Sequence, residues 1–135
     1  MRNIMLTFSV IWILISCNPK ESKNYVWHTK EVTATAYNSL AYQTSSQPNI
    51  TAFGDSLKPG MKYIAVSRDL LALGLKRNTL VTIDGLDGIY LVKDKMNRRW
   101  KNRIDIYMGN DVKAARKWGR KKLSIKYRLE VKDSI

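Results

Sequence analysis

The sequence predicts a mainly β domain, a small closed barrel of about six short strands with one short helix. Residues 123–132 (LSIKYRLEVK) alternate apolar and polar side chains without a break, which is the pattern of a strand with one face in the core. Residues 32–37 (VTATAY) alternate small apolar residues with threonines and favour a second strand. Further short runs rich in Val, Ile and Tyr are each bounded by turn residues, at 63–66, 79–83, 89–93 and 103–108. We expect these strands to close into a barrel, because an open sheet of this size would leave unpaired edges.

One helix is predicted between Asn110, which can cap its N-terminus, and Gly119, which provides its stop. Asp111 in the first turn and Arg116 and Lys117 in the last turn match the polarity that the helix dipole favours. Three apolar residues share the inward side of this helix: Val112, Ala115 and Trp118.

Composition restricts the classes of function. A chain of 135 residues with 44% hydrophobic and 26% charged content is typical of one globular domain. It has one cysteine and one histidine, so we expect no internal disulfide, no metal site and no zinc set. There is also no glycine-rich phosphate loop, and we expect no organic cofactor. The net charge of +13 favours anionic partners.

The amino terminus is typical of an exported lipoprotein. Arg2 precedes an apolar run at residues 4–15, which is shorter than the about 20 apolar residues that span a bilayer. Leu14-Ile15-Ser16-Cys17 resembles a bacterial lipobox, in which the cysteine is lipidated and becomes the first residue of the mature protein. A plain amino-terminal anchor, or a cleaved signal with a chance cysteine, is the alternative. We therefore expect a signal peptide at 1–16, a lipidated Cys17 with a tether at 17–30, and the barrel domain at 31–135.

Export changes the meaning of the positive charge. Outside the cytoplasm the available polyanions are lipid headgroups and the cell wall, and the chain carries no RRM, zinc-finger or helix-turn-helix pattern. We expect no nucleic-acid partner. We expect a monomer in the cell envelope, attached to the membrane through its lipid at the outer membrane and facing the periplasm.

Several motifs in the middle of the chain occur in a recognisable order. They are TAYN at 35–38, TAFG at 51–54, GMKYIAVS at 60–67, then Asp94 and RIDIYMG at 103–109. This series resembles the 3D domain, which is named for three aspartates and shared with the membrane-bound lytic transglycosylase A group. The resemblance covers residues 32–127 and implies a six-stranded double-psi β-barrel.

The resemblance also implies cleavage of the glycan strands of peptidoglycan by a lytic transglycosylase mechanism. In that reaction one carboxylic acid protonates the leaving oxygen and then accepts the proton of the muramic 6-hydroxyl. By the motif match Asp105 is this acid, and Asp94 is a second family aspartate that binds a sugar hydroxyl or tunes Asp105. The matched motifs and strand alternation add five candidate substrate-binding residues: Tyr37, Thr51, Ser67, Arg103 and Tyr107.

Three features depart from the family pattern, and one of them is an insertion of about four residues around residues 75–78. The first family aspartate falls in a segment that usually reads Ala-Val-Asp-Pro, and here Ser67 takes its place. The loop between Asp94 and Asp105 lacks the glycines of the family. The stretch 93–103 instead carries six basic residues: Lys93, Lys95, Arg98, Arg99, Lys101 and Arg103.

These basic residues bear on the proposed acid, because nearby positive charge lowers the pKa of an aspartate whereas a general acid needs a raised pKa. A second carboxylate, Asp94, could supply the opposite effect. Three interpretations therefore stay open: a lytic transglycosylase, a non-catalytic peptidoglycan-binding lipoprotein, and a hydrolase that passes the sugar to water. Asp94 and Asp105 could also be structural, Trp100 could stack on a sugar or close the barrel, and His28 is expected as an exposed tether residue.

Overall fold

The computed structural model describes Cys17, residues 22–39 and residues 49–132. Along this part of the chain the elements follow in the order β1 (Tyr25–Tyr37), β2 (Tyr63–Val66), α1 (Arg68–Ala72), β3 (Leu80–Ile83), β4 (Tyr90–Lys95), β5 (Arg103–Tyr107), α2 (Val112–Trp118) and β6 (Lys121–Glu130). The expected signal peptide at 1–16 lies outside the described residues. Cys17 is exposed.

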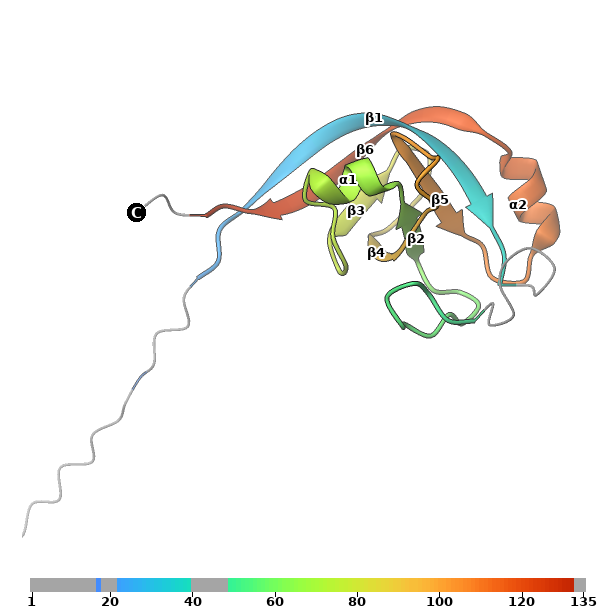
Figure 1. Ribbon diagram of the computed structural model, residues 1–135, viewed down its shortest axis with the longest axis horizontal. Coiled ribbons are helices and arrows are strands. Elements are labelled where there is room, and N and C mark those ends of the chain that lie inside the picture. Colours follow the sequence, from blue (N-terminus) through green and yellow to red (C-terminus); the bar gives the residue numbers. More distant parts are fainter. Residues whose placement is uncertain (1–16, 18–21, 40–48, 133–135) are drawn as a thin grey trace, which may run out of the picture.

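The strands form a closed barrel in the order β1-β5-β2-β4-β3-β6. Two pairs are parallel, β1 with β5 and β2 with β4, and the other pairs are antiparallel. Figure 1 shows the long, curved β1 and β6 running side by side over the shorter strands. The mainly β, six-stranded double-psi barrel expected from the sequence is thus confirmed.

The barrel interior is filled by alternate residues of the short strands. In β5, Ile104 and Ile106 are at most 1% exposed, and Val66 of β2 and Val92 of β4 pack in the same core. Asp105 lies between the two isoleucines and therefore faces the outside of the barrel, because side chains alternate along a strand.

β1 begins at Tyr25, earlier than the expected start at Val32. Its first residues pair antiparallel with β6, from Tyr25 opposite Glu130 to Val32 opposite Leu123. Residues 25–30, expected in the tether, are therefore strand. His28 lies in this strand and its ring stacks on Tyr127 with 5.5 Å between the ring centroids.

The helices also differ from expectation. α1 was not predicted; it has five residues, too few to show helical periodicity, and it inserts the fully buried Leu70 into the core. α2 is found where the sequence places it, but its N-cap is Asp111 rather than Asn110. The Asp111 side chain accepts a hydrogen bond from the backbone N–H of Ala114. No helix in the described part of the chain is both long and apolar enough to cross a membrane.

Candidate active site

The two candidate aspartates lie in one row that crosses four neighbouring strands. Thr35 of β1 pairs with Asp105 of β5, Asp105 pairs with Ala65 of β2, and Ala65 pairs with Asp94 of β4. Paired residues on neighbouring strands point to the same face of a sheet. Both carboxyl groups therefore project from the outer face, with the small side chain of Ala65 between them. Two strand spacings separate their Cα atoms by about 10 Å.

A β-bulge gives Asp94 this direction. Val92 points into the core, and regular alternation would send Asp94 to the core as well. The pairing shifts here, because Ile64 is opposite Val92 whereas the next residue of β2, Ala65, is opposite Asp94. One step on β2 thus matches two steps on β4, and such a bulge re-aims the side chains that follow it.

The carboxyl groups open into a cleft of about 220 Å³. Its lining residues are Tyr37, Ala65, Asp94, Lys95, Met96, Asn97, Trp100 and Asp105. The cleft therefore combines two acids, one aromatic ring from β1, one from the loop between β4 and β5, and a small residue between the acids. Such a surface is suited to a polar ligand with many hydroxyl groups.

Asp105 is largely withdrawn from water and has a raised pKa. Its Oδ1 accepts a hydrogen bond from the Thr35 hydroxyl at 3.0 Å, and Thr35 in turn accepts one from Nε of Arg103 at 3.4 Å. Burial raises the Asp105 pKa to about 6; the Thr35 bond and Arg103 oppose the rise, and the charge of Asp94 adds to it. The carboxyl group can therefore exist in both protonation states near neutral pH.

Asp94 is fixed by backbone donors. Its Oδ1 accepts hydrogen bonds from the backbone N–H groups of Ala52 and Lys95, each at 2.8 Å. Burial raises the Asp94 pKa, and these two bonds counteract part of the rise because they favour the carboxylate. The Ala52 donor is presented by a tight turn in which the Thr51 hydroxyl accepts from the Asp55 N–H at 3.0 Å. Thr51 thus shapes the loop that holds Asp94.

Tyr37 lines the cleft, and its pKa responds to the charges of both acids. Its pKa is raised by burial first and then by the charges of Asp94 and Asp105, so the phenol stays protonated. Its buried hydroxyl has no hydrogen-bond partner among the described residues. Tyr107 lies behind it, 4% exposed, with a ring centroid 5.5 Å from that of Tyr37 and a hydroxyl bonded to Ser39 at 3.0 Å.

Four of the sequence candidates do not line the cleft: Thr51, Ser67, Arg103 and Tyr107. Ser67 is fully buried, and its hydroxyl accepts from the backbone N–H of Arg103 at 2.9 Å, which fixes the start of β5. The Arg103 guanidinium lies over the Trp100 ring at 3.9 Å, and that of Arg99 lies 4.6 Å from the same ring. Trp100 is thereby held at the edge of the cleft.

Sequence reasoning missed several residues of the lining. Ala65 stands inside a quoted motif but has no chemical group that draws attention, and Met96 and Asn97 lie in the loop that departs from the family pattern. Among the described residues no three His, Cys, Asp or Glu side chains gather in a way that could hold a metal ion.

Asp105→Asn is expected to stabilise the barrel at neutral pH by up to about 3 kcal/mol. The folded state binds its proton up to pH of about 6, whereas an unfolded aspartate releases it near pH 3.9. The free energy of unfolding of the wild type therefore falls as pH rises through this window, and the variant avoids that loss. Thermal unfolding at pH 3.5 and pH 7.5 measures it. A variant less stable than wild type at pH 7.5 would show instead that the Asp105 carboxylate stabilises the fold.

Comparisons with known proteins add little to this geometry. No protein-family model matches the chain, and no curated protein matches it. Among solved structures it is similar to an apo expansin of Clavibacter michiganensis and to an aspartate-to-asparagine mutant of that expansin in complex with cellohexaose. In both cases the identity is 18% and the TM-score is 0.46, over 80% of this chain and 52% of the expansin. The chain spans about half the length of these expansins. Similarity at this level assigns no function, and membership of the 3D-domain family stays a prediction.

Proposed function

We propose that this protein cleaves the glycan strands of peptidoglycan by a lytic transglycosylase mechanism, with Asp105 as its acid and base. The observation that carries the proposal is a carboxyl group with a pKa of about 6 in a cleft that it shares with a second carboxyl group. Matched to the aspartate motif RIDIYMG, this environment suits one group that must first give and then take a proton.

The chemistry needs only one proton-transfer group. Protonated Asp105 donates to the oxygen that joins N-acetylmuramic acid to N-acetylglucosamine, and the bond from that oxygen to the muramic anomeric carbon breaks. The Asp105 carboxylate then removes the proton of the muramic 6-hydroxyl, whose oxygen bonds to the anomeric carbon and closes the anhydro ring. The proton count is restored, and no water is consumed. A carboxylate at Asp94 would stabilise the positive charge that develops at the anomeric centre.

Tyr37 and Trp100 have roles consistent with this scheme. The protonated phenol of Tyr37 is a donor for a sugar oxygen and lacks another partner among the described residues. The Trp100 ring offers its edge of the cleft to a sugar, since its position is fixed by Arg99 and Arg103.

The decisive experiment is digestion of purified sacculi followed by mass spectrometry of the released fragments. Anhydro-muramic ends support the proposal, and Asp105→Asn protein is the control for contaminating activity. Reducing ends would show transfer of the sugar to water, and the absence of new ends would contradict catalysis.

A non-catalytic peptidoglycan-binding lipoprotein is the second candidate. It is favoured by one specific feature, the basic loop around Trp100, in which Arg98, Arg99 and Lys101 are exposed and fit an anionic wall. This candidate predicts binding to sacculi that weakens with salt and releases no fragments.

The proposed location is the cell envelope, with the protein attached through a lipid on Cys17 at the outer membrane and facing the periplasm. Cys17→Ala is expected to block processing or to release the domain from membranes, because acyl chains are the long apolar attachment left after cleavage. Fractionation in about 1 M salt, which screens electrostatic attachment, measures this. Ser22→Ala in the tether is the matched control. A mature-sized Cys17→Ala protein that stays in the membrane fraction would contradict the lipid anchor.

A further inference from the structure

The ends of β1 and β6 form a two-stranded ribbon that extends beyond the barrel. Tyr25 to Trp27 pair with Glu130 to Arg128, whereas the pairing of β1 with β5 starts only at Thr33 and that of β6 with β3 ends at Tyr127. Figure 1 shows this ribbon projecting from the barrel at the end opposite α2. We refer to residues 25–27 and 128–132 as the ribbon tip.

The ribbon tip exposes large apolar and aromatic side chains. Tyr25, Val26 and Trp27 are consecutive and are 43%, 47% and 45% exposed, and Val131 on the other strand is 42% exposed. A two-stranded ribbon has no second layer to cover its faces, so this apolar surface stays in contact with solvent in the isolated protein. Tyr25 and Trp27 lie on one face of the ribbon, and Val26 and Val131 lie on the other, so apolar side chains are exposed on both faces of the tip. Exposed apolar surface gathered at one end of a molecule marks an interaction site.

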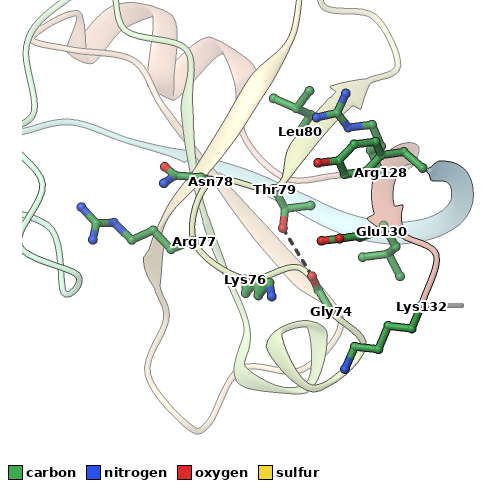
Figure 2. A pocket seen from close by; sticks show the side chains of 11 residues that line it. Gly74, Lys76, Arg77, Asn78, Thr79, Leu80, Arg128, Glu130 and Lys132 are labelled. Atoms are coloured by element: carbon green, nitrogen blue, oxygen red, sulfur yellow. Dashed lines mark hydrogen bonds between the residues drawn. The ribbon is translucent and has the colours of Figure 1, made fainter. Parts of the chain in front are cut away.

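Positive charge surrounds the ribbon tip. A pocket of about 400 Å³ lies between the tip and the loop that follows α1, and Lys76, Arg128 and Lys132 line it (Figure 2). The Arg128 guanidinium lies over the Tyr25 ring at 4.0 Å. The carboxylate in the lining, Glu130, is 3.5 Å from the Lys23 ammonium group.

A further cation of the pocket is already bonded elsewhere. Arg77 donates to both carboxylate oxygens of Asp55, at 2.6 and 3.0 Å, and Figure 2 shows it pointing away from Arg128 and Lys132. The charge that the pocket offers to a ligand therefore comes from Lys76, Arg128 and Lys132, and it is positive.

We propose that the ribbon tip binds an anionic bilayer surface, with Tyr25 and Trp27 at the level of the headgroups and the cations of the pocket against the lipid phosphates. Tyrosine and tryptophan favour the membrane–water interface, and each Lys or Arg near an anionic leaflet strengthens the electrostatic attraction to it. A wall glycan stacked on the aromatic rings would leave the exposed aliphatic side chains of Val26 and Val131 on the opposite face unused, whereas a tip that enters a bilayer surface covers both faces.

The position of the tip in the chain agrees with this partner. Cys17, the proposed lipidation site, lies a short stretch before Tyr25 in the sequence. Even a fully extended chain keeps a bilayer that holds the Cys17 lipid within about 28 Å of the ribbon tip. Asp105 pairs with Thr35, which is about 33 Å further along β1 at the usual rise per residue. Docking of the tip would hold the cleft away from the bilayer, toward the wall. This inference goes beyond the proposed cleavage, since it concerns orientation on the membrane and not chemistry.

The test is tryptophan quenching in the processed protein purified from membranes and reconstituted into vesicles. With phosphatidylglycerol carrying brominated acyl chains we expect loss of most of the Trp27 emission, measured as the difference between wild type and Trp27→Phe. Trp118→Phe, on α2 at the other end of the barrel, is the matched control and should leave the quenched component intact. The emission should return in phosphatidylcholine vesicles that carry the same brominated acyl chains, and also in about 1 M salt, because both changes remove the electrostatic attraction.

A charge variant provides a second readout that keeps every tryptophan. Lys76→Gln with Lys132→Gln should reduce the quenching, whereas Lys113→Gln with Lys117→Gln on α2 should not. Equal Trp27 emission in anionic and zwitterionic vesicles would overturn the proposal, as would Trp27 emission that responds to soluble wall glycan and not to vesicles. Neither outcome depends on whether sacculi are cleaved, so failure here is distinguishable from failure of the proposed function.

Discussion

Asp105→Asn is expected to lower the rate of glycan cleavage by about 10²- to 10⁴-fold, the usual contribution of a general acid–base group. Asparagine has nearly the same shape and its amide oxygen can accept the Thr35 hydrogen bond, which is 3.0 Å long in the native site. It cannot exchange a proton with the glycosidic oxygen or with the 6-hydroxyl. Release of anhydro-muramic fragments from sacculi, followed over time, measures the loss.

Three comparisons make this result specific. Asp94→Asn should cost less, because backbone donors hold that side chain in place and its proposed role is to stabilise charge. Asp84→Asn, on an exposed turn, is the matched control and should cost nothing. Binding of the Asp105→Asn protein to sacculi should be unchanged. Cleavage that survives in this variant would remove Asp105 as the catalyst, and the predicted gain in stability at neutral pH would separate a lost acid from a damaged fold.

Alternation in the short strands was enough to predict the strands of the barrel, and the same alternation accounts for the direction of Asp105. Ile104 and Ile106 fill the core, so the residue between them must face outward. Local patterns could not predict the first half of β1, because its side chains are exposed on both faces and carry no alternation. That segment is a strand because β6 offers a long partner, which is a tertiary effect.

The pairing of the two acids was less predictable. The order of the motifs predicted Asp94 and Asp105 as site residues. Regular alternation from Val92, however, would have placed the Asp94 side chain in the core. Only the bulge opposite Ile64 and Ala65, together with the strand order, places both carboxyl groups on one outer row. Local sequence periodicity predicts neither a bulge nor the order of strands in a barrel.

The charge of the cleft also depends on directions that sequence does not give. The basic residues of 93–103 suggested a lowered pKa for the acid. In the fold, the Lys93 ammonium is 3.6 Å from Asp55, and the Arg103 guanidinium lies over Trp100. Burial outweighs the remaining attraction, and the Asp105 pKa rises.

Ala65→Leu is the second substitution with a large expected effect, and it follows from the structure alone. Ala65 stands between Asp94 and Asp105 in the row of paired residues and lines the cleft. An isobutyl group on this outer face would occupy the space between the carboxyl groups, where the sugar has to sit. We expect cleavage to fall by about 10²-fold or more, because misplacement of a substrate by about 1 Å already costs that much.

The barrel itself should tolerate this change. Ala65 is 6% exposed at the floor of the cleft and lies outside the core cluster that Ile64 and Val66 join, so the larger leucine side chain extends into the cleft and presses on its walls. Ala72→Leu, at the exposed end of α1, is the matched control for added apolar surface. Fragment release from sacculi and thermal unfolding should be measured on both proteins. Loss of cleavage is expected for Ala65→Leu alone, and both proteins are expected to stay folded at the assay temperature. Full cleavage by that variant would mean that the glycan does not pass between the two aspartates, and the site would then have to lie elsewhere on the barrel.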